Sequence, residues 1–134
     1  MEQSILPGPL FILFVRDQQA SRDFYAYVLG KEPVLDVPGM TQFQLESGSM
    51  LGLMPSDNIR RILGERLPDP QKSDGIPRSE VYLFVTNPEQ YHARALSAGA
   101  VEVSPIQTRD WGDLAGYSLD LDGHLLAFAK ESAI

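Results

Sequence analysis

The apolar and polar positions of this chain divide it into short alternating elements. Residues 10–15 are a continuous apolar run of strand length, and Asp17 after them is a suitable N-cap for a helix. The next apolar residues recur at three- and four-residue spacing, and we expect them to form the buried face of that helix: Ala20, Phe24, Tyr27 and Val28. Gly30 follows this pattern and is placed to end the helix.

Three short strands are expected after this helix, because apolar stretches lie there between turn-forming residues. Their ranges are residues 34–37, 41–46 and 50–54. Pro38-Gly39 and Ser47-Gly48 supply the turns between them. Residues 8–54 therefore predict one βαβββ module.

The same order of elements returns near residue 80. A strand is expected over residues 81–85, and Asn87-Pro88 is an N-cap followed by a first-turn proline. The following helix carries Tyr91, Ala95, Leu96 and Ala98 and ends at Gly99. Three further strands are expected over residues 101–107, 116–121 and 125–130, with a tight turn at Asp122-Gly123.

These two halves are an internal repeat. When Val15 is superposed on Val85, Gly30 falls near Gly99, and residues 50–54 match residues 125–129. We therefore predict an α+β fold in a single domain, with modules at about 8–54 and 79–131. Residues 55–78 hold four prolines and read mainly as a long connection, which is either functional or a solvated linker.

The composition argues against several classes of function. The chain has 18 acidic and 11 basic residues, a net charge of −7, and no cysteine. An acidic chain is a poor partner for nucleic acid or for an anionic membrane surface, and disulfide or thiolate chemistry is excluded. The apolar run at residues 10–15 is too short to span a membrane, and Met-Glu-Gln-Ser lacks a basic export signal, so we expect a cytoplasmic location.

The first helix carries a family resemblance. Ser21, Phe24-Tyr25 and Leu29-Gly30 are similar to the helix signature of the vicinal oxygen chelate superfamily. That superfamily contains glyoxalase I, extradiol dioxygenases, and the fosfomycin and bleomycin resistance proteins. Residues 95–100, 109–112 and 117–124 resemble the second module, so the likeness covers roughly residues 10–130. It implies a curved, cup-shaped mixed β-sheet with helices on the outside, and a homodimer.

The resemblance also implies where a metal would be held. Metal-dependent members use the first and last strands of each module, and the corresponding positions here are Leu10, Gly52, Glu80 and Ala127. Only Glu80 has a donor atom, whereas catalytic metal sites use about three protein ligands. His92 and His124 are expected to be a surface and a turn residue. We therefore expect no metal and no cofactor, as in the bleomycin-resistance-like branch.

The strand alternation then assigns residues to the concave face. The predicted ligand-binding residues are Ile12, Phe14, Met50, Met54, Glu80, Tyr82, Phe84 and Trp111. The opposite face of the first strands is expected to be core: Phe11, Leu13, Val15, Val81, Leu83 and Val85. Trp111 either stacks on a planar ligand or fills the rim of the core. Glu80 either contacts a ligand, acts as a base, or pairs with Arg78 or Arg109.

Three functional hypotheses follow. The first is a metal-free protein that binds a mainly apolar or aromatic small molecule in the cup. The second is a lyase, isomerase or dioxygenase with ligands from unusual positions, for which His124 and Glu80 are the pair to test. The third is a scaffold dimer whose cup is filled by its own side chains or by residues 55–78. Arg60, Arg61 and Arg66 in that connection either close over an anion or form a solvated face.

Overall fold

The computed structural model describes residues 6–131 of the chain. The first module contains β1 (Leu10–Val15), α1 (Gln18–Leu29), β2 (Leu35–Val37), β3 (Met40–Gln44) and β4 (Met50–Pro55). The second contains β5 (Glu80–Phe84), α3 (Pro88–Ser97), β6 (Val101–Thr108), β7 (Leu114–Leu119) and β8 (Leu125–Lys130). The predicted pair of βαβββ modules is confirmed.

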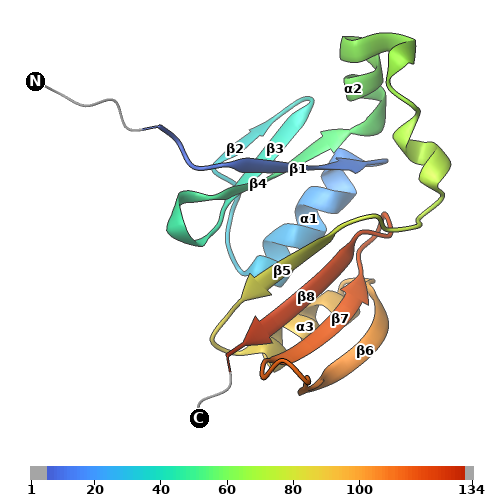
Figure 1. Ribbon diagram of the computed structural model, residues 1–134. Coiled ribbons are helices and arrows are strands. Elements are labelled where there is room, and N and C mark those ends of the chain that lie inside the picture. Colours follow the sequence, from blue (N-terminus) through green and yellow to red (C-terminus); the bar gives the residue numbers. More distant parts are fainter. Residues whose placement is uncertain (1–5, 132–134) are drawn as a thin grey trace, which may run out of the picture.

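Each module forms its own four-stranded sheet. The strand orders are β1-β4-β3-β2 and β5-β8-β7-β6, and in each sheet the first strand pairs parallel with the last. Helices α1 and α3 lie behind the sheets, and the opposite faces are free of helices (Figure 1). The strand register supports the repeat alignment, because Leu10 pairs with Met50 and Glu80 pairs with Leu125.

The predicted capping residues lie at the starts of both helices and at the end of α1. The Asp17 carboxylate accepts a hydrogen bond from the Ala20 backbone N–H, and the Asn87 side chain does the same for Gln90. Gly30 ends α1 with φ 69°, a left-handed conformation that glycine adopts without steric cost.

The buried face of α1 differs from the expected one. The buried residues are Ser21, Phe24, Tyr25, Val28 and Leu29. Ala20 and Tyr27, which we expected on this face, are exposed. The reason is that α1 packs between its own sheet and the second module, so the polar side of Tyr25 finds a partner there and is buried with the apolar residues.

The core lies between the helices and the sheets, with one expected residue missing from it. Leu13 and Val15 are buried as predicted, and Val81, Leu83 and Val85 pack against the same cluster. Phe11 is 58% exposed, so its assignment to the core was wrong. Since β1 is an edge strand and α1 follows the other end of it, nothing from the helix layer covers Phe11.

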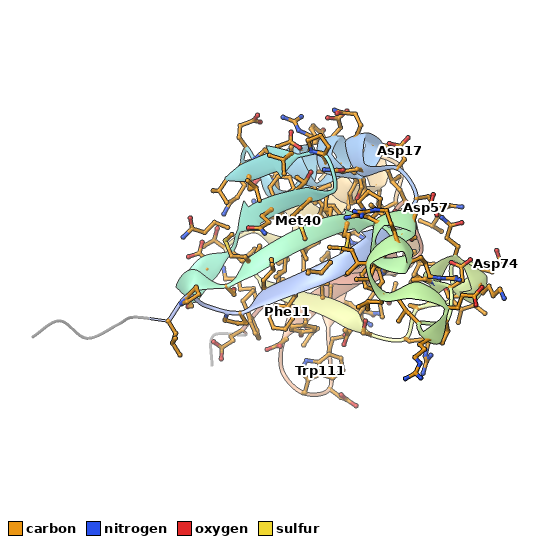
Figure 2. The ribbon with its side chains drawn as sticks, turned by 90° about the horizontal axis from the view of Figure 1, so that it is seen from above. Phe11, Asp17, Met40, Asp57, Asp74 and Trp111 are labelled. Carbon is orange, nitrogen blue, oxygen red and sulfur yellow. The ribbon has the colours of Figure 1, made fainter. Side chains whose placement is uncertain are left out.

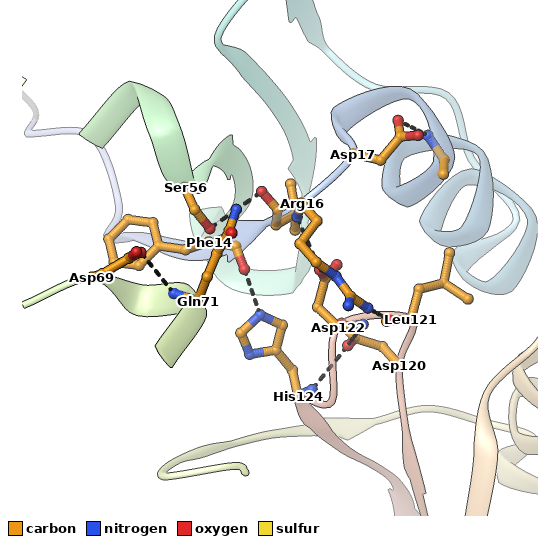
Figure 3. A network of polar contacts seen from close by, with 12 residues as sticks. Phe14, Arg16, Asp17, Ser56, Asp69, Gln71, Asp120, Leu121, Asp122 and His124 are labelled. Atoms are coloured by element: carbon orange, nitrogen blue, oxygen red, sulfur yellow. Dashed lines mark hydrogen bonds and ion pairs between the residues drawn. The ribbon is translucent and has the colours of Figure 1, made fainter. Parts of the chain in front are cut away.

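A polar network joins the two modules at the turn between β7 and β8 (Figure 3). The buried Asp120 carboxylate accepts from the Tyr25 hydroxyl at 2.5 Å and from the backbone N–H groups of Asp122 and His124 at 2.9 Å. Arg16, after β1, donates to the Asp122 carboxylate from both its backbone and its side chain. These contacts fix the end of β1 against the start of β8.

The connection contains α2 (Ser56–Leu63) and the 3-10 turns Gly64–Arg66 and Pro70–Ser73. It runs along one end of the two modules and does not cross the open faces of the sheets (Figure 1). No helix within residues 6–131 combines the length and the apolar character needed to cross a membrane.

Candidate functional site

The open face of the second module carries a chain of aromatic and polar groups. The Trp111 indole N–H donates to the Tyr82 hydroxyl oxygen at 3.1 Å, and the Tyr82 hydroxyl donates to the Asp113 carboxylate at 2.7 Å. The Phe84 ring meets the Tyr82 ring edge to face, with 5.3 Å between centroids. Partial burial and then the bond to Asp113 raise the pKa of Tyr82, so this hydroxyl stays protonated and keeps donating at neutral pH.

Trp111 lies at the apex of the loop between β6 and β7, and its side chain is 57% exposed. The loop is closed by two backbone hydrogen bonds, from Arg109 N–H to the Asp113 carbonyl at 2.8 Å and from Gly112 N–H to the Arg109 carbonyl at 3.0 Å. Trp111 extends from the side of the molecule opposite the start of α1 (Figure 2). An exposed indole is therefore held in place by a tight turn and by Tyr82.

The Arg109 guanidinium is engaged by contacts within the protein. It lies over the Tyr117 ring, 5.0 Å from the centroid, and donates to the carbonyls of Ala115 and Pro105 and to the Ser104 hydroxyl. These contacts hold the β6–β7 hairpin together. They leave Arg109 poorly placed to meet a negative charge on a ligand.

Glu80, at the start of β5, is exposed, and no hydrogen bond or ion pair within residues 6–131 engages its carboxylate. The alternative that it pairs with Arg78 or Arg109 is therefore wrong for the described chain. Its charge does act on Tyr117, whose pKa is raised first by burial and then by Glu80, against the opposing effect of Arg109. A free carboxylate thus lies beside the aromatic residues.

The first module contributes an apolar face. Leu10 and Ile12 are 40% and 38% exposed, and their side chains surround Gly52 together with Met40. A Cβ atom built on Gly52 would lie 3.2 Å from Leu10 and from Met40 and 3.3 Å from Ile12. Any larger side chain at this position would displace its neighbours.

The positions implied for a metal do not fit one. Gly52 is enclosed by apolar side chains, and Ala127 is fully buried between Tyr82 and Tyr117 on neighbouring strands. No group of three histidine, aspartate or glutamate residues gathers anywhere in the described part of the chain. Within residues 6–131, Glu80 is therefore not part of a histidine or carboxylate group that could hold a divalent cation.

Neither histidine is free on the surface. His92 is 5% exposed and contacts the Glu102 carboxylate through Nε2 at 2.8 Å, so its assignment as a surface residue was wrong. The reason is that this side of α3 faces β6 and β7 and not solvent. His124 lies in the β7–β8 turn as expected, and its Nε2 contacts the Phe14 carbonyl at 2.9 Å (Figure 3). A carbonyl only accepts, so Nε2 carries the proton.

Two cavities lie where the modules meet. The first, about 460 Å³, lies between residues 70–79 of the connection and the β7–β8 turn, and Phe14 lines it. The second, about 840 Å³, includes Tyr82 and Phe84 beside the end of α1. The linings of these two cavities contain none of the other predicted ligand residues, which are Ile12, Met50, Met54, Glu80 and Trp111.

Sequence reasoning missed Asp113, Tyr117 and Asp120 as partners in these arrangements. Asp113 and Tyr117 bear on the site through Tyr82, Arg109 and Glu80, whereas Asp120 joins the modules. The strand alternation of β7 places Tyr117 on the face of Ala127, so the pattern of that strand contained the signal for Tyr117.

Residues 9–128 match the family model described as the glyoxalase/bleomycin resistance protein/dioxygenase superfamily. The chain belongs to this superfamily. An uncharacterized protein of Mycobacterium bovis is 28% identical over 115 residues, which are 84% of this chain and 75% of that protein.

Solved structures of superfamily members have the same fold. A glyoxalase-related enzyme from Fulvimarina pelagi has a TM-score of 0.78 at 24% identity, covering 95% of this chain and 89% of that one. A superfamily enzyme from Burkholderia phytofirmans has a TM-score of 0.76 at 17% identity, covering 90% of this chain and 95% of that one. At these identities the likeness defines the fold and leaves the ligand open.

Proposed function

We propose that this superfamily member is a metal-independent binding protein of the bleomycin-resistance-like kind. Its ligand is a mainly apolar or aromatic small molecule that contacts the open faces of the two sheets. The observation that carries the proposal is the exposed Trp111 indole, held at 3.1 Å from the Tyr82 hydroxyl beside an apolar strand surface. Large rigid rings provide much contact area at a low cost in conformational entropy.

The replaced donor positions support the metal-independent part of the proposal. Leu10, Gly52 and Ala127 have no donor atoms, and His124 is engaged by the Phe14 carbonyl. A reaction that depends on a metal would need at least two further protein ligands beside Glu80. The strand neighbours of Glu80 are instead Leu125, its partner on β8, and Tyr82, two residues along β5.

Ligand binding is tested with the fluorescence of Trp111, which is the only tryptophan of the chain. We expect planar two- and three-ring compounds to quench or shift its emission. Replacing the Tyr82 hydroxyl in Tyr82→Phe frees the indole N–H and should weaken binding several-fold, on the order of one hydrogen bond's contribution to preorganisation. Tyr27→Phe, a change at an exposed tyrosine of α1, is the matched control and should leave binding unchanged.

The metal content of the purified protein is a second test of the proposal. Elemental analysis of protein purified without chelators should give far less than one transition-metal ion per chain. One tightly bound ion per chain that is lost in Glu80→Gln would contradict the proposal and favour a lyase, isomerase or dioxygenase. Absence of any fluorescence response across the planar compounds would contradict the binding function itself.

We also propose that the protein is a homodimer, as the resemblance implies. Leu10, Phe11 and Ile12 leave an apolar stretch exposed on β1, and the outer edge of β1 pairs with no other strand of its sheet. Exposed apolar patches and open sheet edges are typical of protein–protein contacts.

A further inference from the structure

The charged side chains near Trp111 and Tyr82 are not equally available to a ligand. On the open face of the first module, the strand positions are occupied by apolar residues and glutamines. On the second module, the charged side chains that act on Tyr82 and Tyr117 are Glu80, Asp113 and Arg109. Their engagement by the protein differs, and this difference decides which ligand charge the face accepts.

Arg109 and Asp113 are already satisfied. The Arg109 guanidinium is stacked on Tyr117 and donates to three backbone or hydroxyl acceptors, and the Asp113 carboxylate accepts from Tyr82. Glu80 is the third of these side chains, and within residues 6–131 no basic side chain forms an ion pair with it. A ligand stacked against Trp111 and Tyr82 therefore meets the unpaired Glu80 carboxylate, whereas the nearby Arg109 guanidinium is already engaged.

The aromatic rings favour the same ligand charge. Tyr82 and Glu80 are two residues apart on β5 and so extend from the same face, about 7 Å apart along the strand. Trp111 contacts Tyr82, and Tyr117 lies within the electrostatic reach of Glu80. The faces of aromatic rings attract cations, most strongly for tryptophan. Stacking and ion pairing thus act together on a flat molecule that carries a positive charge.

We infer that this face selects planar aromatic cations, with the ring against Trp111 and the positive charge beside the Glu80 carboxylate. The inference rests on the proposed binding function and specifies its ligand class. Neutral rings of the same size gain only the stacking contacts. Anionic rings meet the negative charges of Glu80 and Asp113, and the Arg109 guanidinium beside them is already engaged.

Three probes of matched shape test the inference: N-methylquinolinium, which is a cation, neutral 1-methylnaphthalene, and the anion 1-naphthoate. Trp111 fluorescence and calorimetry on the full chain report binding. We expect the cation to bind about tenfold more tightly than the neutral ring, and the anion more weakly than both. Added salt should weaken binding of the cation and leave the neutral ring unaffected.

Two substitutions at Glu80 separate this role from the overall acidity of the chain. Glu80→Gln should lower the affinity for N-methylquinolinium about tenfold and leave 1-methylnaphthalene unchanged. Glu89→Gln removes the same charge from the exposed first turn of α3 and should change neither affinity. Glu80→Lys should reverse the order, so that 1-naphthoate binds more tightly than the cation.

The outcomes distinguish the two proposals. If none of the three probes binds the wild-type chain, the binding function fails. If all three bind with similar affinity, or if Glu80→Gln and Glu89→Gln weaken the cation equally, binding stands and the selection of cations by Glu80 is overturned. Circular dichroism of each variant verifies that it is folded.

Discussion

The hydroxyl group of Tyr25 connects the two halves of the chain. It lies on α1 of the first module and donates to Asp120 of the second at 2.5 Å, in a site where Tyr25 is 1% exposed. Tyr25→Phe leaves one buried carboxylate oxygen without its donor, so we expect the free energy of unfolding to fall by about 1–3 kcal/mol. Urea denaturation measures the loss. Tyr27→Phe, at an exposed position of the same helix, should change it by less than about 0.5 kcal/mol.

Tyr25 also makes the stability of the folded protein depend on pH in the alkaline range. Burial and then the negative charge of Asp120 raise the pKa of Tyr25 well above its ordinary value of 10.0. The unfolded chain therefore releases this proton from about pH 10 while the folded chain retains it, and stability falls as the pH rises further. Tyr25→Phe lacks this contribution and should lose less stability between pH 9 and pH 11. Equal losses in the two proteins would show that Tyr25 is not the responsible group.

Single residues also mark where the sequence was insufficient. The three- and four-residue spacing around Phe24 and Val28 placed Tyr27 on the buried face, whereas the structure buries Tyr25 there together with the polar Ser21. The hydroxyl of the buried Tyr25 has a partner because Asp120 lies next to it in the fold. Asp120 is 95 residues further along the chain, so the helix pattern contains no sign of this contact. His92 was missed for a similar reason, since its partner Glu102 lies on the next strand and the helix pattern alone contains no sign of it.

At the scale of elements, the caps of α1 and α3 are equivalent positions of the repeat. Asp17 and Asn87 each accept a hydrogen bond from a backbone N–H in the first turn of their helix. Asp17→Ala and Asn87→Ala should each lower the free energy of unfolding by about 0.5–2 kcal/mol. The two caps share no partner, so their effects should add in the double variant. Asp17→Asn keeps a capping oxygen and should cost much less.

Most element boundaries were predictable because capping and turn residues act only on their immediate neighbours in the sequence. Gly30, Asn87-Pro88 and Asp122-Gly123 each act within a few residues of their own position, and both ends of α1, the start of α3 and the last turn lie where they were expected. Helix α3 ends at Ser97, before the predicted Ala98 and Gly99. The exposure of Phe11 was not predictable in this way. It depends on β1 being an edge strand that α1 covers at one end only, which is a property of the sheet order.

At the scale of the whole molecule, the repeat predicts two similar modules and says nothing about how they contact each other. That contact comes from residues that the repeat does not duplicate, such as Arg94 of α3, which donates twice to the Val28 carbonyl near the end of α1. The candidate site also depends on residues that the repeat does not duplicate. Glu80 and Trp111 belong to the second module, and their counterparts in the first module are apolar or absent, so the proposed binding face is asymmetric.

The exposed apolar stretch of β1 provides a test of the proposed dimer. Phe11 is 58% exposed, and a charge there would be buried against a second copy of the chain. Phe11→Glu should therefore shift the protein from dimer to monomer in sedimentation velocity experiments. Val103→Glu on β6 is a matched control, because Val103 is 56% exposed on the outermost strand of the other sheet, and this variant should stay dimeric. A wild-type protein that sediments as a monomer at all concentrations would contradict the dimer. Equal dissociation by the two substitutions would place the contact elsewhere than β1.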